Sequence, residues 1–392
     1  MGLIKLLLIS IMSLFMGCSF MVSRLIPLND IKSPTGNYQI GTETFYWVDT
    51  SRAEWFSENS KDKRELIVQA WYPANARSDK KYSWVDYSNQ RVESLSESFD
   101  VPKFMVRAVD RVSTDTYIET IPIQDIKEFP VIIFSHGFEG FRFQNTTQIQ
   151  ELVSHGYIVF ALDHTYDATL TIFPDGTQIE RAKKYCYNCE EEEFREVFNP
   201  QIDTRISDII FILDQIEKIK TNEIATNFSS LLDLDKIGIF GHSFGGGTSL
   251  AASILDSRIK SCLSLDGWYV PIIPNVYNQE FHKPFLHLGQ TKWSKVENYQ
   301  ILDQILESKE GVGYKLSLEG AHHYDFTDSP HLSNLASKFD LSSELKSDEI
   351  LEVTNTTVLG FFDSYLKEIE TNWLDKLNSN DNIIIKKFNK KD

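Results

Sequence analysis

The chain has few cysteines and no surplus of basic residues. Four cysteines among 392 residues exclude a disulfide-dense scaffold of the kind that small secreted domains use. Lysine and arginine number 39 against 56 aspartates and glutamates, so the net charge is −17, which argues against a dedicated nucleic-acid-binding protein. The sequence shows no internal repeat and no low-complexity tract beyond the acidic run 190–193. Its length alone allows two or three domains.

A long apolar run is also missing. Lys5 is followed by an apolar stretch over residues 6–16, which is shorter than the roughly 20 residues that span a bilayer. A basic residue, a short apolar run and a small residue are typical of an export signal, here residues 1–17. Gly17-Cys18 resembles a bacterial lipoprotein processing site. We therefore expect a lipid anchor on Cys18 and an exported protein held at a membrane, in the periplasm or at the cell surface, with ordinary secretion as the alternative.

Export also affects how the remaining cysteines are interpreted. Cys186 and Cys189 are spaced C-x-x-C, but a zinc site would need a second pair or histidines at metal-ligand spacing, and the sequence has neither. A local disulfide is the favoured interpretation, and two inert thiols are the alternative. Cys262 stands in an apolar run and is expected to be a small buried side chain.

The alternation of predicted strands and helices indicates one α/β domain over residues 39–375. It lies between a tether or N-terminal arm (18–38) and a polar, basic tail (376–392). Apolar strands alternate with helical segments after residue 130, which favours a mostly parallel sheet covered by helices on both faces. The strands are expected at 43–49, 65–74, 130–137, 157–164, 236–241, 259–267, 283–290 and 314–321. The helices are expected at 147–155, 205–219, 244–255 and 349–366.

Three segments interrupt this alternation of strands and helices. Residues 75–100 are polar and are expected to form a surface loop. Residues 101–112 have apolar positions at helical spacing, which predicts a helix packed on the domain or a face that touches lipid or substrate. Residues 165–199 follow a strand end and are expected to be an insertion that overhangs a site.

The sharpest chemical signal is Gly241-His242-Ser243-Phe244-Gly245. It lies between an apolar strand and a small-residue helix, the context in which a G-x-S-x-G motif forms a sharp turn with its serine exposed above the sheet. Gly241 and Gly245 lack a Cβ, so the two arms of the turn can approach closely. We predict Ser243 as a nucleophile, with a purely structural glycine-rich turn as the alternative.

A serine nucleophile needs a general base, and the base needs an orienting carboxylate. The expected chain order in this architecture is serine, acid, histidine. Asp266 ends the strand that follows the motif, whereas the next strand ends at Gln290 with no acid nearby. The base is His322 or His323, which both follow the last strand, and spacing alone does not choose between them.

The oxyanion of a tetrahedral intermediate needs two backbone donors. The N–H of Phe244, directly after the nucleophile, is one; Gly137 allows a tight turn that directs the N–H of Phe138 to the same place. No metal and no cofactor are expected, because these donors take the part of a Lewis acid. The side chains expected to line the pocket are His136, His242, Trp268 and His322.

At these residues the sequence resembles the platelet-activating factor acetylhydrolases of the plasma and intracellular type-II kind, which are α/β-hydrolases. The similarity runs in order from about residue 35 to about residue 375. Its segments are SPTGNYQIG, FSHGFEGFR, ELVSHGYIVFALDH, IFGHSFGGGT, LDGWYVPI and HYDFTD.

The resemblance implies that Ser243 is the nucleophile, Asp266 the acid and His323 the base, because His323 directly precedes the matching Tyr-Asp-Phe-Thr-Asp run. It also implies a serine esterase that removes short or oxidised acyl groups from phospholipid-like esters through an acyl-enzyme, as 1-alkyl-2-acetylglycerophosphocholine esterases do. Residues 164–167 and the insertion 165–199 depart from the family pattern. The alternatives are a general carboxylesterase or polyester hydrolase, and a non-catalytic, lipid-anchored binding protein. The acidic charge favours zwitterionic or neutral esters over anionic lipid surfaces.

Overall fold

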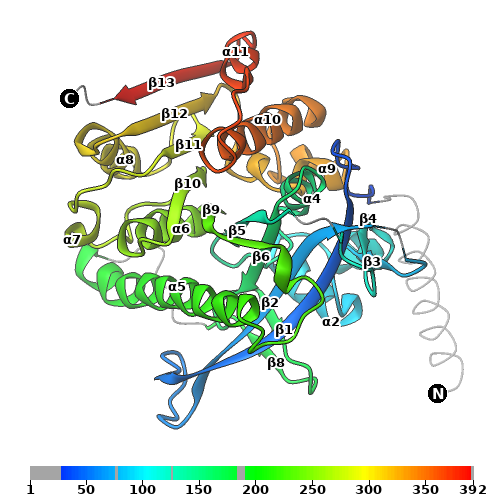
Figure 1. Cartoon of the computed structure of the whole chain (residues 1–392). Helices are drawn as coiled ribbons and strands as arrows, with labels where there is room; N and C mark the ends of the chain where they lie inside the picture. The colour runs from blue at the N-terminus through cyan, green and yellow to red at the C-terminus, as the bar shows by residue number, and fades with distance from the viewer. Residues whose placement is uncertain (1–27, 76–77, 125–126, 183–189, 390–392) are drawn as a thin grey trace, which may run out of the picture.

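A computed structural model describes residues 28–75, 78–124, 127–182 and 190–389 of the chain. Within these residues, eleven strands form one sheet in the order β13-β12-β11-β10-β9-β5-β6-β2-β1-β4-β3 (Figure 1). The strands are β1 (Gln39–Ala53), β2 (Lys63–Ala74), β3 (Lys81–Ser83), β4 (Ser113–Tyr117), β5 (Phe129–Ser135), β6 (Ile158–Asp163), β9 (Leu232–His242), β10 (Ile259–Leu265), β11 (Phe285–Gln290), β12 (Val312–Leu318) and β13 (Ile383–Asn389).

The central strands of the sheet, from β6 through β5, β9, β10 and β11 to β12, are all parallel. Antiparallel strands flank them, with β2 beside β6 and β13 beside β12. The long hairpin of β1 and β2 extends away from the body of the molecule (Figure 1). The predicted mostly parallel α/β fold is confirmed, and the carboxyl ends of its parallel strands meet at one edge, where ligands bind in such folds.

Helices cover both faces of the sheet because its strands are apolar on both sides. On β5, Val131 and Ile133 join the core formed with helices α5 (Glu191–Lys220), α6 (Phe244–Leu255) and α8 (Val296–Ser308). Ile132 and Phe134 point to the opposite core, formed with α4 (Thr146–Ser154), α10 (Ser347–Tyr365) and α11 (Trp373–Asn378). This alternation gives the domain two cores, one on each face of the sheet.

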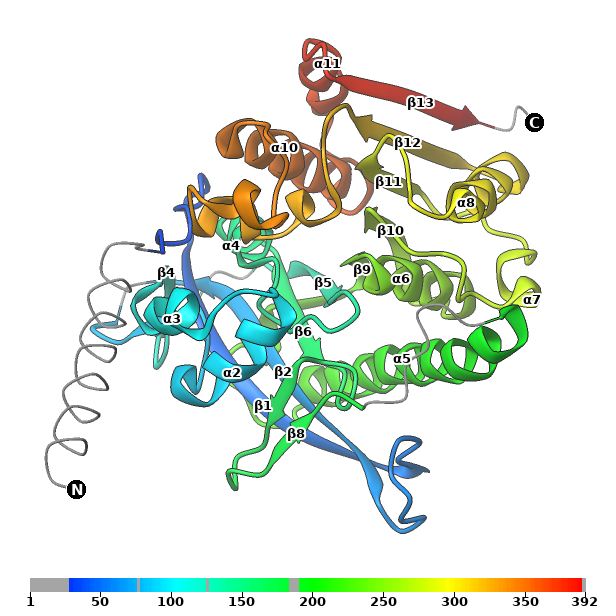
Figure 2. The same cartoon turned by 180° about the vertical axis from the view of Figure 1, so that it is seen from behind.

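A third apolar cluster is formed mainly by residues between 84 and 112, together with Ile31, Phe141, Phe143 and Leu332. Figure 2 shows the helices of this segment near β4. Residues 75–100 were expected to be a loop, but they contain β3 and the helix α2 (Ser88–Ser98). The single helix predicted over 101–112 is instead a short α3 (Lys103–Val106) followed by a 3₁₀ helix η1 (Arg107–Arg111). Most apolar positions of this segment are still buried and Phe104 is partly buried, because a three-residue period keeps Val106 and Val109 on one face.

The predicted insertion 165–199 is shorter than expected. It holds a small hairpin of β7 (Leu170–Ile172) and β8 (Gln178–Glu180), and α5 begins at Glu191, well before the predicted start at residue 205. The acidic run 190–193 has the composition of a loop, but negative charge is favourable at a helix N-terminus, where it meets unpaired N–H groups. Pro200 lies inside this helix.

Both ends of the described chain are part of the domain. In the expected N-terminal arm, the Asn29 N–H donates to the Leu332 carbonyl and the Thr35 N–H to Glu151. Within the expected polar, basic tail, residues 383–389 form β13 and pair with β12. Ile383 and Ile385 pack against the core while Ile384 between them is exposed, which is the alternation of a half-buried edge strand.

Candidate active site

Ser243 lies at the sharp turn between β9 and α6. Its backbone has φ 55° and ψ −121°, a conformation that a residue with a Cβ rarely adopts. The flanking glycines make the turn sterically feasible: a Cβ on Gly241 would lie 2.3 Å from the Gly245 carbonyl oxygen, and one on Gly245 would lie 2.0 Å from the Ser135 carbonyl oxygen. The motif therefore forms the strained strand–turn–helix that the sequence predicted.

This strain predicts a stability difference between two variants that both lack the hydroxyl. Ser243→Gly should be more stable than Ser243→Ala by about 1 kcal/mol, because glycine adopts a positive φ without a steric penalty and alanine does not. Thermal or urea unfolding of the two proteins measures the difference. An alanine variant as stable as the glycine variant, or more stable, would show that the turn is not strained.

Asp266 follows β10 and is completely buried, with φ 44°. Its carboxylate accepts hydrogen bonds from Tyr299 Oη (2.8 Å) and from the side chain of Gln290 (2.9 Å), and the His323 Nδ1 lies 2.6 Å from Oδ2. Burial by itself raises the pKa of Asp266, but the hydrogen bond and the charge of His323 outweigh it and hold the pKa below its usual value. The carboxylate is therefore ionised at neutral pH and accepts the Nδ1–H of His323.

The two candidate histidines occupy different environments. His323 is the first residue of the 3₁₀ helix η3 (His323–Phe326), which follows β12. Its ring is hydrogen-bonded to Asp266 and packs against the Trp293 ring, with 4.8 Å between the two ring centroids. His322 is exposed, caps η3, and its backbone N–H donates to Asp325. The tertiary structure thus brings His323, and not His322, to the carboxylate.

Ser243 and His323 face one cavity of about 220 Å³. Gly137 and Phe138, from the loop after β5, form part of its wall, and Trp268 forms another part. The turn of this loop is closed by a hydrogen bond from the Gly140 N–H to the Gly137 carbonyl (3.0 Å). The predicted oxyanion loop and the predicted nucleophile therefore border the same space.

The other predicted pocket histidines lie at different depths. His242 lines the cavity, and its Nε2–H donates to the His323 carbonyl at 2.9 Å. Burial lowers the pKa of His242 to about 3, so its ring is neutral at physiological pH. His136 is fully buried behind the loop and does not line the cavity, and neither does His322.

Sequence reasoning missed several residues of this site. Trp84, Phe99 and Trp293 also line the cavity, and the first two come from the segment that was expected to be a surface loop. Behind Trp268, the rings of Phe194 and Phe198 from the early part of α5 extend the aromatic wall, at centroid distances of 5.8 and 5.0 Å. Among these residues, only Trp293 offered a signal, because it lies shortly after the end of β11.

Several expectations fall on residues whose structure is not described. Cys18, Cys186 and Cys189 all lie outside the described residues, so the anchor and the disulfide stay predictions. In the described ranges, no helix is long and apolar enough to cross a membrane. Over the same ranges, no group of three or more histidine, cysteine, aspartate and glutamate side chains is arranged to hold a metal ion.

The chain is similar to known proteins over most of its length. The family model for platelet-activating factor acetylhydrolase, isoform II, matches residues 27–384. The chain belongs to this family. It is thereby one of the carboxylic ester hydrolases, as the sequence indicated, and its mostly parallel sheet is that of an α/β-hydrolase.

Individual relatives are distant. The chain is 23% identical to the platelet-activating factor acetylhydrolase of Canis lupus familiaris over 370 residues, which is 89% of this chain and 80% of that one. The Gallus gallus acetylhydrolase is 25% identical over 61% of this chain and 63% of its own length. A probable 1-alkyl-2-acetylglycerophosphocholine esterase of Arthroderma benhamiae is 26% identical over 76% of each chain.

Among solved structures, a ferulic acid esterase from Streptomyces cinnamoneus superimposes with a TM-score of 0.72 at 24% identity. The match covers 91% of this chain and 99% of that one. At this identity it shows that the two chains share a fold.

Proposed function

We propose that this protein is a serine esterase that removes short or oxidised acyl groups from phospholipid-like esters through an acyl-enzyme. One observation carries the proposal: His323, which is hydrogen-bonded to the buried Asp266, lines the same cavity as Ser243, which stands on a strained turn. Membership of the acetylhydrolase family supports the same chemistry.

In the proposed mechanism, Ser243 Oγ attacks the ester carbonyl while His323 Nε2 takes its proton. Asp266 holds the Nδ1–H of His323 and stabilises the imidazolium that forms. The Phe138 and Phe244 N–H groups donate to the oxyanion of the tetrahedral intermediate. His323 then gives its proton to the leaving alcohol, and a water molecule, activated by the same histidine, hydrolyses the acyl-enzyme to release the acid and restore Ser243.

The size and the aromatic surroundings of the cavity support the proposal that the substrate carries a short acyl group. Phe138, Phe244 and Trp268 pack together, with centroid distances of 5.3 to 6.4 Å, and the cavity next to them is about 220 Å³. The named relatives act on platelet-activating factor or an alkyl-acetyl-glycerophosphocholine, according to their names. An acetylated ether phospholipid is therefore the first substrate to test.

A chain-length series tests the substrate. The acetyl ester of an alkyl-glycerophosphocholine should be hydrolysed with a kcat/KM at least tenfold above that of the corresponding palmitoyl ester. A p-nitrophenyl ester series separates acyl length from head group. Equal rates on long simple esters, with none on the phospholipid, would favour a general carboxylesterase. Absence of any Ser243-dependent hydrolysis would favour a non-catalytic binding protein.

The proposed role of Asp266 as the orienting acid leads to a separate kinetic prediction. Asp266→Asn should lower kcat by about 10⁴-fold with little change in KM, because an amide holds the wrong tautomer of His323. Steady-state kinetics measure the loss, and Asp303→Asn is a matched control because Asp303 pairs with Lys315 outside the cavity. A kcat for Asp266→Asn within tenfold of the unmodified protein would remove Asp266 from the mechanism.

We also propose that the protein is exported and held at a membrane by a lipid on Cys18. The support is the sequence of residues 1–18. Mass spectrometry of the mature N-terminus, from membranes of the producing cells, tests it. An unmodified N-terminal residue other than Cys18 would refute the anchor.

A further inference from the structure

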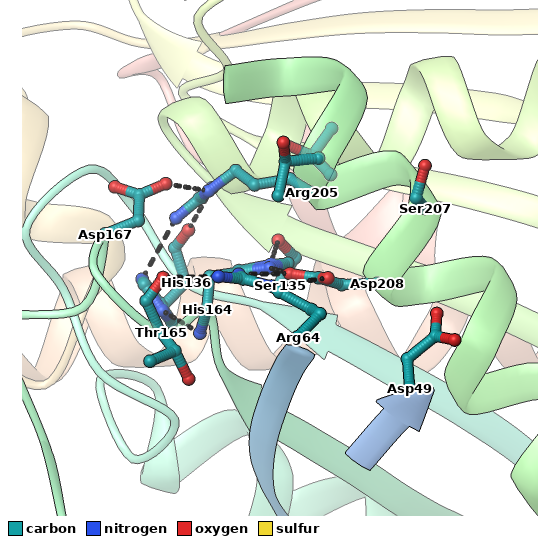
Figure 3. Close-up of polar contacts among 12 residues, drawn as sticks. Asp49, Arg64, Ser135, His136, His164, Thr165, Asp167, Arg205, Ser207 and Asp208 are labelled. Atoms are coloured by element: carbon teal, nitrogen blue, oxygen red, sulfur yellow. Dashed lines mark hydrogen bonds and ion pairs between the residues drawn. The ribbon is translucent and has the colours of Figure 1, made fainter. Parts of the chain in front are cut away.

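A buried polar cluster lies directly beneath the loop that follows β5 (Figure 3). Arg205 of α5 reaches this loop, and both the arginine and its partner Asp167 are almost completely buried. The Arg205 Nε donates to the Asp167 carboxylate, which directs the rest of the guanidinium group towards the loop. A fully buried guanidinium group needs several hydrogen-bond acceptors, and two of the acceptors of Arg205 are backbone carbonyls of the loop.

The guanidinium group bonds two consecutive carbonyls. Arg205 Nη1 donates to the His136 oxygen at 2.9 Å, and Nη2 donates to the Gly137 oxygen at 3.2 Å. Because the guanidinium is planar and its donors have a fixed spacing, this contact sets the orientation of both peptide groups.

The orientation of the second peptide group matters for catalysis. The Gly137 carbonyl and the Phe138 N–H belong to the same planar trans peptide, so they point in opposite directions. Arg205 holds the Gly137 carbonyl on the side of the loop that faces away from the cavity. The N–H of the same peptide therefore points to the opposite side, on which Gly137 and Phe138 line the cavity. Rotation of this peptide would turn the N–H away from the oxyanion.

Neighbouring residues reinforce the same contact. The His164 N–H donates to His136 Nε2 (3.1 Å), so the neutral His136 ring carries its proton on Nδ1, which donates to the Gly137 carbonyl at 2.6 Å. His164 is held in turn between Ser135 Oγ and the Asp208 carboxylate, each at 2.9 Å. The Gly137 carbonyl thus accepts from His136 and Arg205 in addition to the Gly140 N–H that closes the turn.

Arg205 also touches the second proposed donor residue. Its guanidinium carbon lies 4.6 Å from the centre of the Phe244 ring, a cation–π contact with the residue that follows Ser243. One buried side chain therefore contacts the Gly137 carbonyl, which shares a peptide group with the Phe138 N–H, and the ring of Phe244.

We propose that Arg205 is a positioning residue that sets the geometry of the oxyanion hole from below. The proposal rests on the proposed esterase function. Arg205 does not line the cavity, so it acts on the transition state only through the Phe138 peptide and the Phe244 ring.

The test compares Arg205→Lys and Arg205→Met with Arg64→Lys. Lysine keeps the charge beside Asp167 but lacks the fork that bonds two carbonyls, and methionine removes the donors at similar length. Arg64 is an equally buried arginine of the same cluster, and its bonds go to Asp208, Glu54 and the Thr165 carbonyl, so it reaches the loop only indirectly, through Asp208 and His164. All rates are divided by the number of active sites that a fluorophosphonate probe titrates, which removes the effect of unfolded protein.

Both Arg205 variants should lower kcat for p-nitrophenyl acetate by about 30- to 300-fold and leave KM within threefold, since loss of one oxyanion donor costs about 10²–10³. The affinity for a trifluoromethyl ketone, which forms an oxyanion on the serine, should fall in parallel with kcat/KM. Arg64→Lys should lower the melting temperature but keep kcat per active site within threefold. The split between kcat and KM is a readout that a loss of stability alone would not produce.

Three results overturn the proposal: an unchanged kcat in both Arg205 variants, an equal loss in Arg64→Lys, or a loss carried by KM alone. If Arg205→Met does not fold, Arg205→Lys decides the matter by the same criteria. Failure of the esterase function itself is a separate outcome, because the unmodified protein would then show no Ser243-dependent probe labelling.

Discussion

Replacing Ser243 by alanine is expected to lower kcat for ester hydrolysis by about 10⁶-fold and to leave the fold intact. The turn at Ser243 is held by backbone hydrogen bonds, from the Ser243 N–H to the Leu265 carbonyl (2.9 Å) and from the Trp268 N–H to the Ser243 carbonyl (2.8 Å). Neither bond involves the hydroxyl, so its removal takes away the nucleophile and no structural contact of the backbone.

The measurement combines turnover of p-nitrophenyl acetate with fluorophosphonate labelling. Ser249→Ala is the matched control, because Ser249 is a buried serine of α6, the helix that follows Ser243, and lies outside the cavity. It should keep kcat within twofold and label normally. Residual turnover above about one part in 10³ in Ser243→Ala, together with labelling at another residue, would show that a different nucleophile performs the reaction.

Replacing His323 by alanine is expected to have an effect of the same size, about 10⁶-fold in kcat, because a serine hydroxyl without its base is a poor nucleophile. The neighbouring His322 provides a stringent comparison. His322 is the N-cap residue of η3, and asparagine is a favoured N-cap residue, so His322→Asn keeps this end of η3 while removing the imidazole. That variant should retain kcat within threefold.

Kinetics at saturating substrate distinguish the two histidines. A large loss in His322→Asn with near-normal turnover in His323→Ala would reverse the assignment of the base. Equal, moderate losses in both variants would point to a disturbed η3 rather than to a missing base. Circular dichroism and melting temperatures of both proteins separate this case from a catalytic effect.

Local patterns predicted many of the elements that carry the site. Helix α6 was expected at 244–255 and lies at Phe244–Leu255, because a glycine-rich turn and a continuous run of small and apolar residues define it without help from the rest of the chain. Asp266 was expected at the end of a strand, and it directly follows β10. Predictions failed where a segment takes its structure from its neighbours, as in residues 191–204 of α5 and in β13.

The choice between His322 and His323 shows the limit of spacing. Both follow the same strand, and adjacent residues differ only in the direction of their side chains. Asp266 and His323 are 57 positions apart, and Arg205 and His136 are 69 apart. Contacts over such separations depend on how β5, β9, β10 and β12 line up in the sheet, which no local pattern encodes.

By itself, the sequence determined the α/β class, the strand–turn–helix at Ser243 and the position of Asp266 directly after the next strand. It could do so because hydrophobic periodicity and glycine placement act over short distances along the chain. Only the tertiary structure brought His323 to Asp266, Trp84 and Phe99 to the cavity wall, and Arg205 beneath the loop at Gly137. The physical reason is that burial and hydrogen bonding between distant segments exist only once the sheet has assembled and its carboxyl edge has gathered the loops.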